Sequence, residues 1–462
     1  MKPTVLSNIV KNDLCIGCGV CAGICPERSL EIWFNQFGEY NPIQNNPCSK
    51  ECGLCMKVCP FAYGNDNEDT IGTALYGSIP RIQHREEIGY YLNSYVGYAL
   101  ATRARGSSGG MATWLLMELL KKGVVEYVIA VVPNDDPKKL FKFSILTNPE
   151  NITSAFGSAY YPVELSELLR EIQNKPGSCA IIGLPCFIKA IRLAQKNNGK
   201  LRQRIAVTLG LACGQLKGKH FTEYIASLAG ANGIITSVRY RNKSSDQPAS
   251  NFYFSFMSSG KNEKRIFWKD GISEVWENRW FTPTACNYCD DIFAECADIT
   301  FLDAWLPKYS SDPRGTNLII VRSQRANEIL REGIKSSDIE VNDISIDDVI
   351  RSQEGVISIK REHLAYRLYR AHQQGVQMPM KRVKSAAIMN PLIRMDIEFK
   401  EKMQQESRNN FSEKILKDDF YNQAFRQSMT PYLKKIRLLR KVSAGLSLPL
   451  VGFRKIKRYI HG

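Results

Sequence analysis

Apolar and polar residues alternate along the middle of the chain with two different periods. Between residues 94 and 321, short apolar runs predict strands at 94–101, 125–132, 141–146, 178–182, 205–209, 234–240, 252–257, 264–268, 299–301 and 317–321. Apolar positions three and four residues apart predict helices at 109–122, 164–173, 185–196 and 217–228. Strands that alternate with amphipathic helices are typical of an α/β body, so we expect a mixed sheet covered by helices.

The composition is that of a globular protein with several domains. The chain has 462 residues, of which 44% are hydrophobic and 23% are charged, and these fractions exclude a disordered, collagenous or coiled-coil chain. No apolar run reaches the roughly 18–20 residues of a membrane span. Lys11, Asn12 and Asp13 interrupt the start of the chain too early for a secretory signal. We therefore expect an intracellular, cytoplasmic protein.

The fourteen cysteines change this picture, because eight of them lie between Cys15 and Cys59. In a reducing compartment such clustering favours metal sites over disulfides, and all-thiolate sites favour iron–sulfur clusters or zinc. The first run, from Cys15 to Pro26, has the spacing C-x2-C-x2-C-x3-C-P, which is that of bacterial ferredoxins. A second run, from Cys48 to Pro60, repeats this spacing with one additional residue in its first gap.

Two such runs in tandem resemble a two-cluster ferredoxin domain, in which the fourth cysteine of each run crosses to the other cluster. The resemblance implies one [4Fe-4S] cluster held by Cys15, Cys18, Cys21 and Cys59, and a second held by Cys48, Cys52, Cys55 and Cys25. The additional residue, Ser49 or Lys50, leaves open how the Cys48 ligand is reached. The alternatives are a pair of zinc ribbons and a radical-SAM site, and the C-x3-C-P ending of both runs argues against each.

A glycine-rich turn follows the first predicted strand and opens the first predicted helix. It begins at Arg105 and reads RGSSGG, in which Ser107 or Ser108 can cap the helix, while Gly109 and Gly110 allow a ligand to approach the backbone. Free amides and the helix dipole then form an anion site that suits a pyrophosphate. The turn matches neither the dinucleotide fingerprint nor a Walker loop, and a plain capped helix start explains it equally well.

Four of the remaining cysteines lie at the ends of predicted strands. They are Cys186, Cys213, Cys286 and Cys289. Cys186 and Cys213 each follow a strand, and parallel strands of one sheet end at the same edge, so the four thiols can surround a third cluster. The alternative is that they are small buried hydrophobic residues, as we expect for Cys179 and Cys296.

Seven short segments, in this order along the chain, resemble the family of coenzyme F420 hydrogenase/dehydrogenase beta subunits. They begin at Arg105 (RGSSGGMAT), Gly157 (GSAYYP), Gly183 (GLPC), Gly210 (GLACG), Val238 (VRYRNK), Ala285 (ACNYC) and Ala297 (ADI, then LDAW). The resemblance covers roughly residues 93–355 and implies an FAD-containing iron–sulfur oxidoreductase that exchanges electrons with F420 or another reducible substrate. The family usually has Gly before the Asp-Ala-Trp, where this chain has Leu302, and this departure leaves the substrate open.

The resemblance also implies a third cluster at the strand-end cysteines and a set of cofactor contacts. The candidate cofactor residues are Ser107, Ser108, Gly109, Gly110, Tyr160, Arg239, Arg241, Lys243, Asp303 and Trp305. The turn would hold the FAD pyrophosphate. The three alternating cations are expected to face an anionic cofactor or substrate, unless they form a solvated strand edge. The aromatic residues are expected to stack on the isoalloxazine, although such side chains more often belong to a core.

The expected domain organisation has five parts. They are a two-cluster ferredoxin domain at 1–65, a linker at 66–93, two parts of the family body at 94–177 and 178–355, and a helical, basic C-terminal region at 356–462. The predicted fold class is therefore multidomain α/β, or α+β, with a mixed-sheet, flavin-binding body.

Positive charge is concentrated at the C-terminus. The net charge is +16, and residues 426–462 contain ten Lys and Arg but no Asp or Glu. Residues 431–441 place Leu433, Ile436 and Leu438 or Leu439 on one side of a basic helix, and a second basic piece follows at 454–459. Such a helix is typical of contact with an anionic membrane, here its inner face, or with an acidic partner; the alternative is a solvated tail that covers a core edge. No binding motif accompanies the charge, so nucleic acid is not expected as a partner.

The leading functional hypothesis is an oxidoreductase with two or three [4Fe-4S] clusters and FAD. It would pass electrons between a redox partner protein and a small substrate such as F420, and the flavin would carry the chemistry, so no catalytic side chain is assigned. The alternative is a non-catalytic, ferredoxin-like subunit that docks a partner enzyme. A third hypothesis, a redox enzyme of cell-surface polysaccharide modification, rests on analogy alone.

Overall fold

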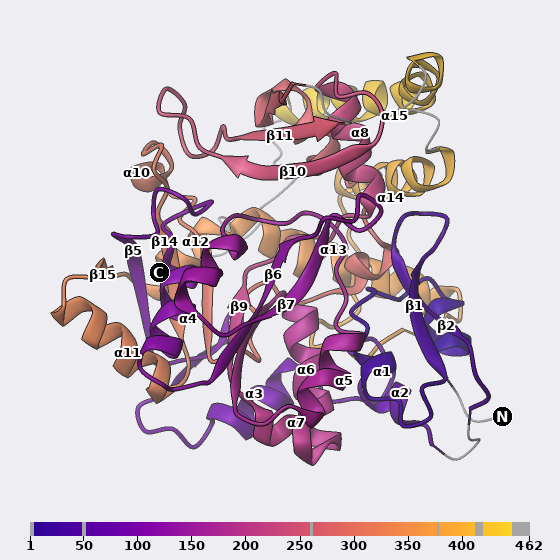
Figure 1. Cartoon of the computed structure of the whole chain (residues 1–462). Coiled ribbons are helices and arrows are strands. Elements are labelled where there is room, and N and C mark those ends of the chain that lie inside the picture. Colours follow the sequence, from indigo (N-terminus) through magenta and orange to yellow (C-terminus); the bar gives the residue numbers. More distant parts are fainter. Residues whose placement is uncertain (1–3, 49–51, 259–261, 377, 412–418, 446–462) are drawn as a thin grey trace, which may run out of the picture.

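The computed structural model describes residues 4–48, 52–258, 262–376, 378–411 and 419–445. Its N-terminal part is a small ferredoxin-type unit, drawn in indigo in Figure 1. The unit consists of the π-helical turn η1 (Leu6–Val10), the short helices α1 (Val20–Gly23) and α2 (Leu54–Lys57), and the antiparallel strands β1 (Leu30–Phe34) and β2 (Tyr40–Gln44). Each short helix follows a glycine in the left-handed conformation, in which φ is 76° at Gly19 and 58° at Gly53.

Residues 66–93, which the sequence predicts as a linker, form regular structure. They fold into helix α3 (Glu68–Tyr76) and a hairpin of β3 (Gln83–Arg85) and β4 (Gly89–Tyr91). The Asn67 side chain caps α3 by accepting a hydrogen bond from Thr70 N at 2.9 Å. The buried Tyr76 hydroxyl donates to Cys296 O at 3.1 Å. The segment between the cysteine runs and the α/β body thus has its own helix and hairpin, which pack against that body.

Eight strands form the central sheet in the order β15-β5-β14-β13-β9-β8-β6-β7 (Figure 1). They are β5 (Asn93–Ala99), β6 (Tyr127–Pro133), β7 (Phe141–Leu146), β8 (Cys179–Gly183), β9 (Ile205–Leu211), β13 (Ile299–Asp303), β14 (Asn317–Val321) and β15 (Ile339–Asp343). Strand β9 is parallel to β8 and β13, and β8 is parallel to β6, whereas the other neighbours are antiparallel. The predicted mixed sheet is confirmed; β15, at its edge, was not predicted.

Helices cover both faces of this sheet. They are α4 (Met111–Lys121), α5 (Ser166–Asn174), α6 (Pro185–Asn197), α7 (Gly199–Arg204) and α11 (Gln324–Lys335), with the 3-10 turn η2 (Pro149–Ala155). Because side chains alternate along a strand, Val128 packs in a core with α4 and α11, and the next residue, Ile129, packs in another with α5 and α6. The second core includes Val20 of the ferredoxin-type unit, so the two parts share one interior. Cys179 and Cys296 are buried in it, as predicted for packing residues.

A second, three-stranded antiparallel sheet lies near the C-terminal helices (Figure 1). It contains β10 (Ile235–Asn242), β11 (Tyr253–Ser258) and β12 (Lys264–Phe267), with α8 (Lys219–Leu228), η3 (Trp268–Asp270) and α9 (Ile272–Glu277). The remaining elements are η4 (Thr284–Tyr288), α10 (Pro307–Ser310), α12 (Ile346–Ser352), α13 (Glu354–Gln373), α14 (Pro391–Asn410) and α15 (Asp419–Gly445). Phe221 of α8, Phe254 of β11 and Phe425 of α15 belong to one core, so the C-terminal helices are part of the folded body.

The described part of the basic C-terminal region lies against this core. Ile436 and Leu439 are 1% and 4% exposed and Leu433 packs partly buried against this core, whereas Leu438 is 63% exposed. The apolar side of residues 431–441 is therefore buried within the protein, with Leu439 rather than Leu438 as its member. This arrangement agrees with the alternative of a tail that covers a core edge. Residues 446–462, with the second basic piece at 454–459, lie outside the described residues. None of the described helices combines the length and apolarity that a membrane crossing requires.

Candidate functional site

The first cysteine set of the ferredoxin-type unit is buried at Cys18 and half-buried at its other three positions. It consists of Cys15, Cys18, Cys21 and Cys59, which are electrostatic neighbours. The loop curls at Gly17, where φ is 68°, and a Cβ there would lie 2.6 Å from Tyr40 O. Gly17 N donates to Cys15 Sγ at 3.4 Å. Burial raises the pKa of Cys18 to about 12, so these thiols require a bound metal to become thiolates together.

The second cysteine set lies nearer the surface. It consists of Cys25, Cys48, Cys52 and Cys55, which are again electrostatic neighbours. Cys48 is exposed, and Ser29 N donates to Cys25 Sγ at 3.3 Å. Residues 49–51, which include the additional residue of the second run, lie outside the described residues. The structure thus brings Cys25 to the second run and Cys59 to the first, which is the exchange typical of a two-cluster ferredoxin.

The four strand-end cysteines form a third set. Cys186 follows β8 and Cys213 follows β9, and these parallel neighbours end at one edge of the sheet. Cys286 and Cys289, from η4 and the residue after it, complete the lining of a small cavity that also includes Lys360. Among the residues that the structure describes, no three His, Cys, Asp or Glu side chains are placed to hold a single metal ion. A cubane, in contrast, takes one thiolate at each of its four irons.

Buried cations surround the third set. Lys217 and Arg279 are each 4% exposed. Lys217 Nζ donates to Trp280 O at 2.8 Å, and Arg279 Nε and Nη2 have no hydrogen-bond partner within the described ranges. Burial lowers the pKa of Lys217 well below its usual value and that of Arg279 to about 10, whereas the Cys286 charge raises both. Uncompensated buried cations are costly, so this environment fits an anionic cluster held by four thiolates.

A cavity of about 590 Å³ adjoins both the first and the third sets, because Cys15 and Cys213 line it. Its volume is in the range of small-molecule and cofactor sites. Seven candidate cofactor residues are in the lining: Ser107, Ser108, Gly110, Tyr160, Arg241, Asp303 and Trp305. Gly109, Arg239 and Lys243 are not among the lining residues. Many of the other lining residues are apolar, so the cavity combines an apolar wall with a few polar groups.

The glycine-rich turn contributes to this cavity, but its serines do not cap α4. The helix begins at Met111, after Gly110 with φ of 78°, and Asn317 Oδ1 accepts the hydrogen bond from Met111 N at 3.2 Å. Ser108 Oγ instead donates to a backbone carbonyl. Ser107 Oγ is buried and has no partner among the described residues, which leaves a hydroxyl for a ligand. The capping prediction is therefore wrong. The contact from Asn317 could not be predicted from the local sequence, because Asn317 lies 206 residues from Met111.

The three predicted cations do not share one face, because β10 is irregular after Arg239 and φ is 53° at Arg241. Arg239 is exposed. Lys243 Nζ donates to Ser108 O at 2.7 Å, and burial lowers the pKa of Lys243 to about 8. Arg241 alone lines the cavity, and two hydrogen bonds of 2.7 and 2.8 Å join it to Asp303. The prediction of one row of cations is wrong, because the bulge changes the direction of successive side chains.

Comparison with models of protein families shows the family of this chain. A model described as coenzyme F420 hydrogenase/dehydrogenase, beta subunit, N-term, matches residues 94–170, and the corresponding C-terminus model matches residues 177–347. The chain belongs to this family. A model of a 4Fe-4S binding domain matches residues 9–31, which contain the first cysteine run.

Two curated relatives carry F420 in their names. The chain is 22% identical over 218 residues to an F(420)H(2) dehydrogenase subunit of Methanosarcina mazei, covering 46% of this chain and 56% of the relative. It is 24% identical over 355 residues to coenzyme F420-dependent sulfite reductase of Methanocaldococcus jannaschii, covering 72% and 49%. The chain therefore spans about half the length of these relatives. A chain of the xenon-derivatised F420-reducing [NiFe] hydrogenase complex from Methanosarcina barkeri is 18% identical, with a TM-score of 0.47, covering 60% of this chain and 92% of that chain.

The matched ranges show which parts of the site lie inside the two family models. The glycine-rich turn, the third cysteine set and most of the cavity lining lie within the two family ranges. Helices α13, α14 and α15 lie beyond residue 347. The C-terminal helices therefore add contacts to the family body, and two of their buried cations, Lys360 and Arg408, reach the cysteine-bearing segments.

Proposed function

We propose that the chain is an iron–sulfur flavoprotein oxidoreductase. It passes electrons between [4Fe-4S] clusters and FAD, and reduces or oxidises F420 or another small substrate. The observation that supports this most directly is the cavity of about 590 Å³, because Cys15 of the first set and Cys213 of the third set both line it. A cofactor in this cavity is adjacent to both sets of cluster ligands.

Ser107, Arg241 and Trp305 are the residues that would hold FAD. Ser107 supplies a buried hydroxyl without a partner, and Arg241 Nε is also without one among the described residues. Asp303 orients the Arg241 guanidinium through two hydrogen bonds, and the Trp305 ring centroid lies 5.7 Å from Arg241 Cζ. FAD, when bound, exchanges two electrons with a substrate and single electrons with clusters. The side chains therefore bind and orient the cofactor, and the aromatic lining excludes water.

The three cysteine sets would hold three clusters. The first and second sets serve the ferredoxin-type unit, and the third set serves the family body, where Lys217 and Arg279 balance the negative charge of four thiolates. The second set includes the exposed Cys48, so a redox partner protein would exchange electrons at that surface. The order of the sets then leads from the surface, through the first set, to the cavity.

F420 is the first substrate to test, because both curated relatives carry it in their names. The test mixes anaerobically purified, oxidised protein with reduced F420 and follows the flavin and cluster absorbance. We expect the flavin band to bleach first and the cluster bands to follow. If reduced F420 does not bleach the absorbance of the bound FAD, F420 is excluded as the substrate.

A matched pair of variants tests the cofactor site itself. Arg241→Ala should lower the FAD content, because it removes a cavity-lining guanidinium, whereas Arg239→Ala, at an exposed position of the same strand, should not. Wild-type protein with a full iron and sulfide content and no FAD would contradict the proposal. That result would support the alternative of a non-catalytic, ferredoxin-like subunit.

A further inference from the structure

Helix α13, beyond the matched family ranges, brings a buried lysine to the third cysteine set. Lys360 is 3% exposed, and its Nζ donates to Cys289 Sγ at 3.3 Å and to Asp291 O at 2.7 Å. Within the described part of the chain, no carboxylate forms an ion pair with this amine. The ammonium group therefore has the ligand sulfur of Cys289 as a direct partner.

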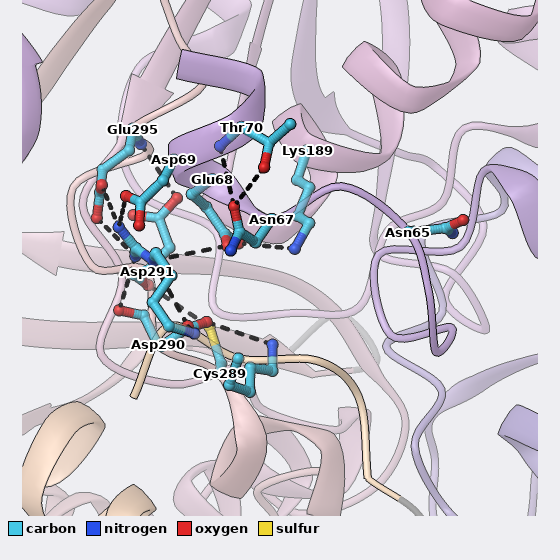
Figure 2. Close-up of polar contacts among 12 residues, drawn as sticks. Asn65, Asn67, Glu68, Asp69, Thr70, Lys189, Cys289, Asp290, Asp291 and Glu295 are labelled. Carbon is cyan, nitrogen blue, oxygen red and sulfur yellow. Dashed lines mark hydrogen bonds and ion pairs between the residues drawn. The ribbon is translucent and has the colours of Figure 1, made fainter. Parts of the chain in front are cut away.

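A buried ion-pair network holds the segment that carries this sulfur. Lys381 Nζ lies 3.3 Å from Asp290 Oδ1, and Arg382 Nη1 lies 2.5 Å from Glu295 Oε2. Figure 2 shows Cys289 and Asp290 close together, with Glu295 and residues of α3 above them in this view. These charged contacts hold the residues that follow Cys289. They therefore also fix the position of the Cys289 sulfur relative to Lys360.

We propose that Lys360 raises the reduction potential of the third cluster. The inference rests on the proposed function, since it takes the third set as cluster ligands. Reduction adds one electron, and thus one negative charge, to the cluster and requires no proton. A buried cation beside a ligand sulfur stabilises the more negative, reduced form more than the oxidised form, and hydrogen bonds to the sulfurs also set cluster potentials.

The N-terminal sets have a different environment. Backbone amides donate to sulfurs of these sets, for example Gly17 N to Cys15 Sγ and Ser29 N to Cys25 Sγ. In the first set, no lysine or arginine among the described residues donates to a sulfur. Lys360 thus makes the third cluster, one of the two beside the cavity, easier to reduce, and this difference favours electron movement from the ferredoxin-type unit towards the third set.

The test compares charge-removing and charge-keeping variants of the full chain, purified anaerobically. Lys360→Met removes the charge and the donor, Lys360→Gln keeps a donor without the charge, and Lys360→Arg keeps both. Lys400→Met is the matched control, because Lys400 is also buried, at 8% exposure, but pairs with Asp396. Iron and sulfide are counted, and midpoint potentials are measured by redox titration with electron paramagnetic resonance. The signal that Cys286→Ser abolishes identifies the third cluster.

We expect Lys360→Met to lower the equilibrium constant for reduction of the third cluster about tenfold or more, which is about 59 mV for one electron. In Lys360→Arg and Lys400→Met, the midpoint potential of the third cluster should change by less than a third of that shift. If Lys360→Met loses the cluster, Lys360→Gln carries the test and should show the same direction. An unchanged midpoint in a charge-removing variant that retains all its iron overturns the inference and leaves the proposed function intact. A wild-type protein without the third cluster overturns both.

Discussion

Arg408 joins the ferredoxin-type unit to helix α14, and its removal tests how the two parts are held together. Its guanidinium donates to Glu39 Oε1 and Oε2 at 2.8 and 2.9 Å, and to Asp13 Oδ1 and Oδ2 at 2.7 and 2.6 Å. It also donates to Thr284 Oγ1 at 2.8 Å, two residues before Cys286. One side chain thus connects the unit, α14 and the segment of the third cysteine set.

The expected loss of unfolding free energy depends on how deeply the two carboxylates that Arg408 contacts are buried. Glu39 is 5% exposed, and breaking a buried ion pair by removing one partner costs about 3–5 kcal/mol. The Asp13 side chain is 44% exposed, so its pair adds less than about 1 kcal/mol. Arg408→Met should therefore reduce the free energy of unfolding by about 3–5 kcal/mol near neutral pH.

The same substitution predicts a pH dependence. Burial raises the pKa of Glu39 to about 7, although Arg408 opposes the rise. A folded pKa above the unfolded value means that this contribution to stability is present at low pH and is lost as the pH rises through about 7. Without Arg408, the pKa of Glu39 in the folded protein is higher still. The loss of stability that accompanies the rise in pH therefore continues to higher pH. The destabilisation should be larger near pH 8 than near pH 6.

The assay is anaerobic urea unfolding, followed by cluster absorbance for the ferredoxin-type unit and by far-ultraviolet circular dichroism for the body. Arg437→Met is the control, because the Arg437 side chain is 62% exposed in its pair with Glu274, and it should change stability by less than about 1 kcal/mol. A loss below about 1 kcal/mol for Arg408→Met, or an equal loss at both pH values, would refute the reasoning.

Two further predictions concern the C-terminal helix and the cofactor cavity. Ile436→Ala should cost about 2–5 kcal/mol, because Ile436 is 1% exposed, while Leu438→Ala, at 63% exposure, should stay within about 0.5 kcal/mol; equal effects in urea unfolding would contradict the packing of α15. Ser107→Ala should weaken FAD binding up to about tenfold, since one hydrogen bond contributes about 0.5–1.5 kcal/mol. Ser154→Ala should not, because Ser154 lines the same cavity but donates to Asn151 O; equal affinities in fluorescence titrations would exclude the Ser107 contact.

Local patterns were sufficient for much of the secondary structure. The predicted strands at 141–146 and 317–321 agree with β7 and β14 at both ends, because apolar runs flanked by polar residues mark a strand clearly. The meeting of Cys186 and Cys213 also followed from a local argument, since parallel strands end at one edge of a sheet. The ferredoxin-type unit was likewise predicted from a local pattern, the spacing of two cysteine runs in tandem.

The missed features depend on residues far apart in the sequence. Lys360 reaches Cys289 across 71 residues, and Asn317 reaches Met111 across 206, so no sequence window contains both partners. The bulge after Arg239 interrupts a strand that reads as regular. Helix α3 was taken for a linker because its turn-forming neighbours masked a short amphipathic pattern, which becomes stable only when Tyr76 packs against the body.

The central claim is that three [4Fe-4S] clusters and one FAD share this chain, and their stoichiometry tests it most directly. Iron, sulfide and flavin should be measured in anaerobically purified wild-type protein and in Cys286→Ser. We expect about twelve irons per chain in the wild type, four for each cubane, and about eight in the variant, with one FAD in the wild type. A wild type that contains zinc instead of iron, or about eight irons that Cys286→Ser leaves unchanged, would contradict the account.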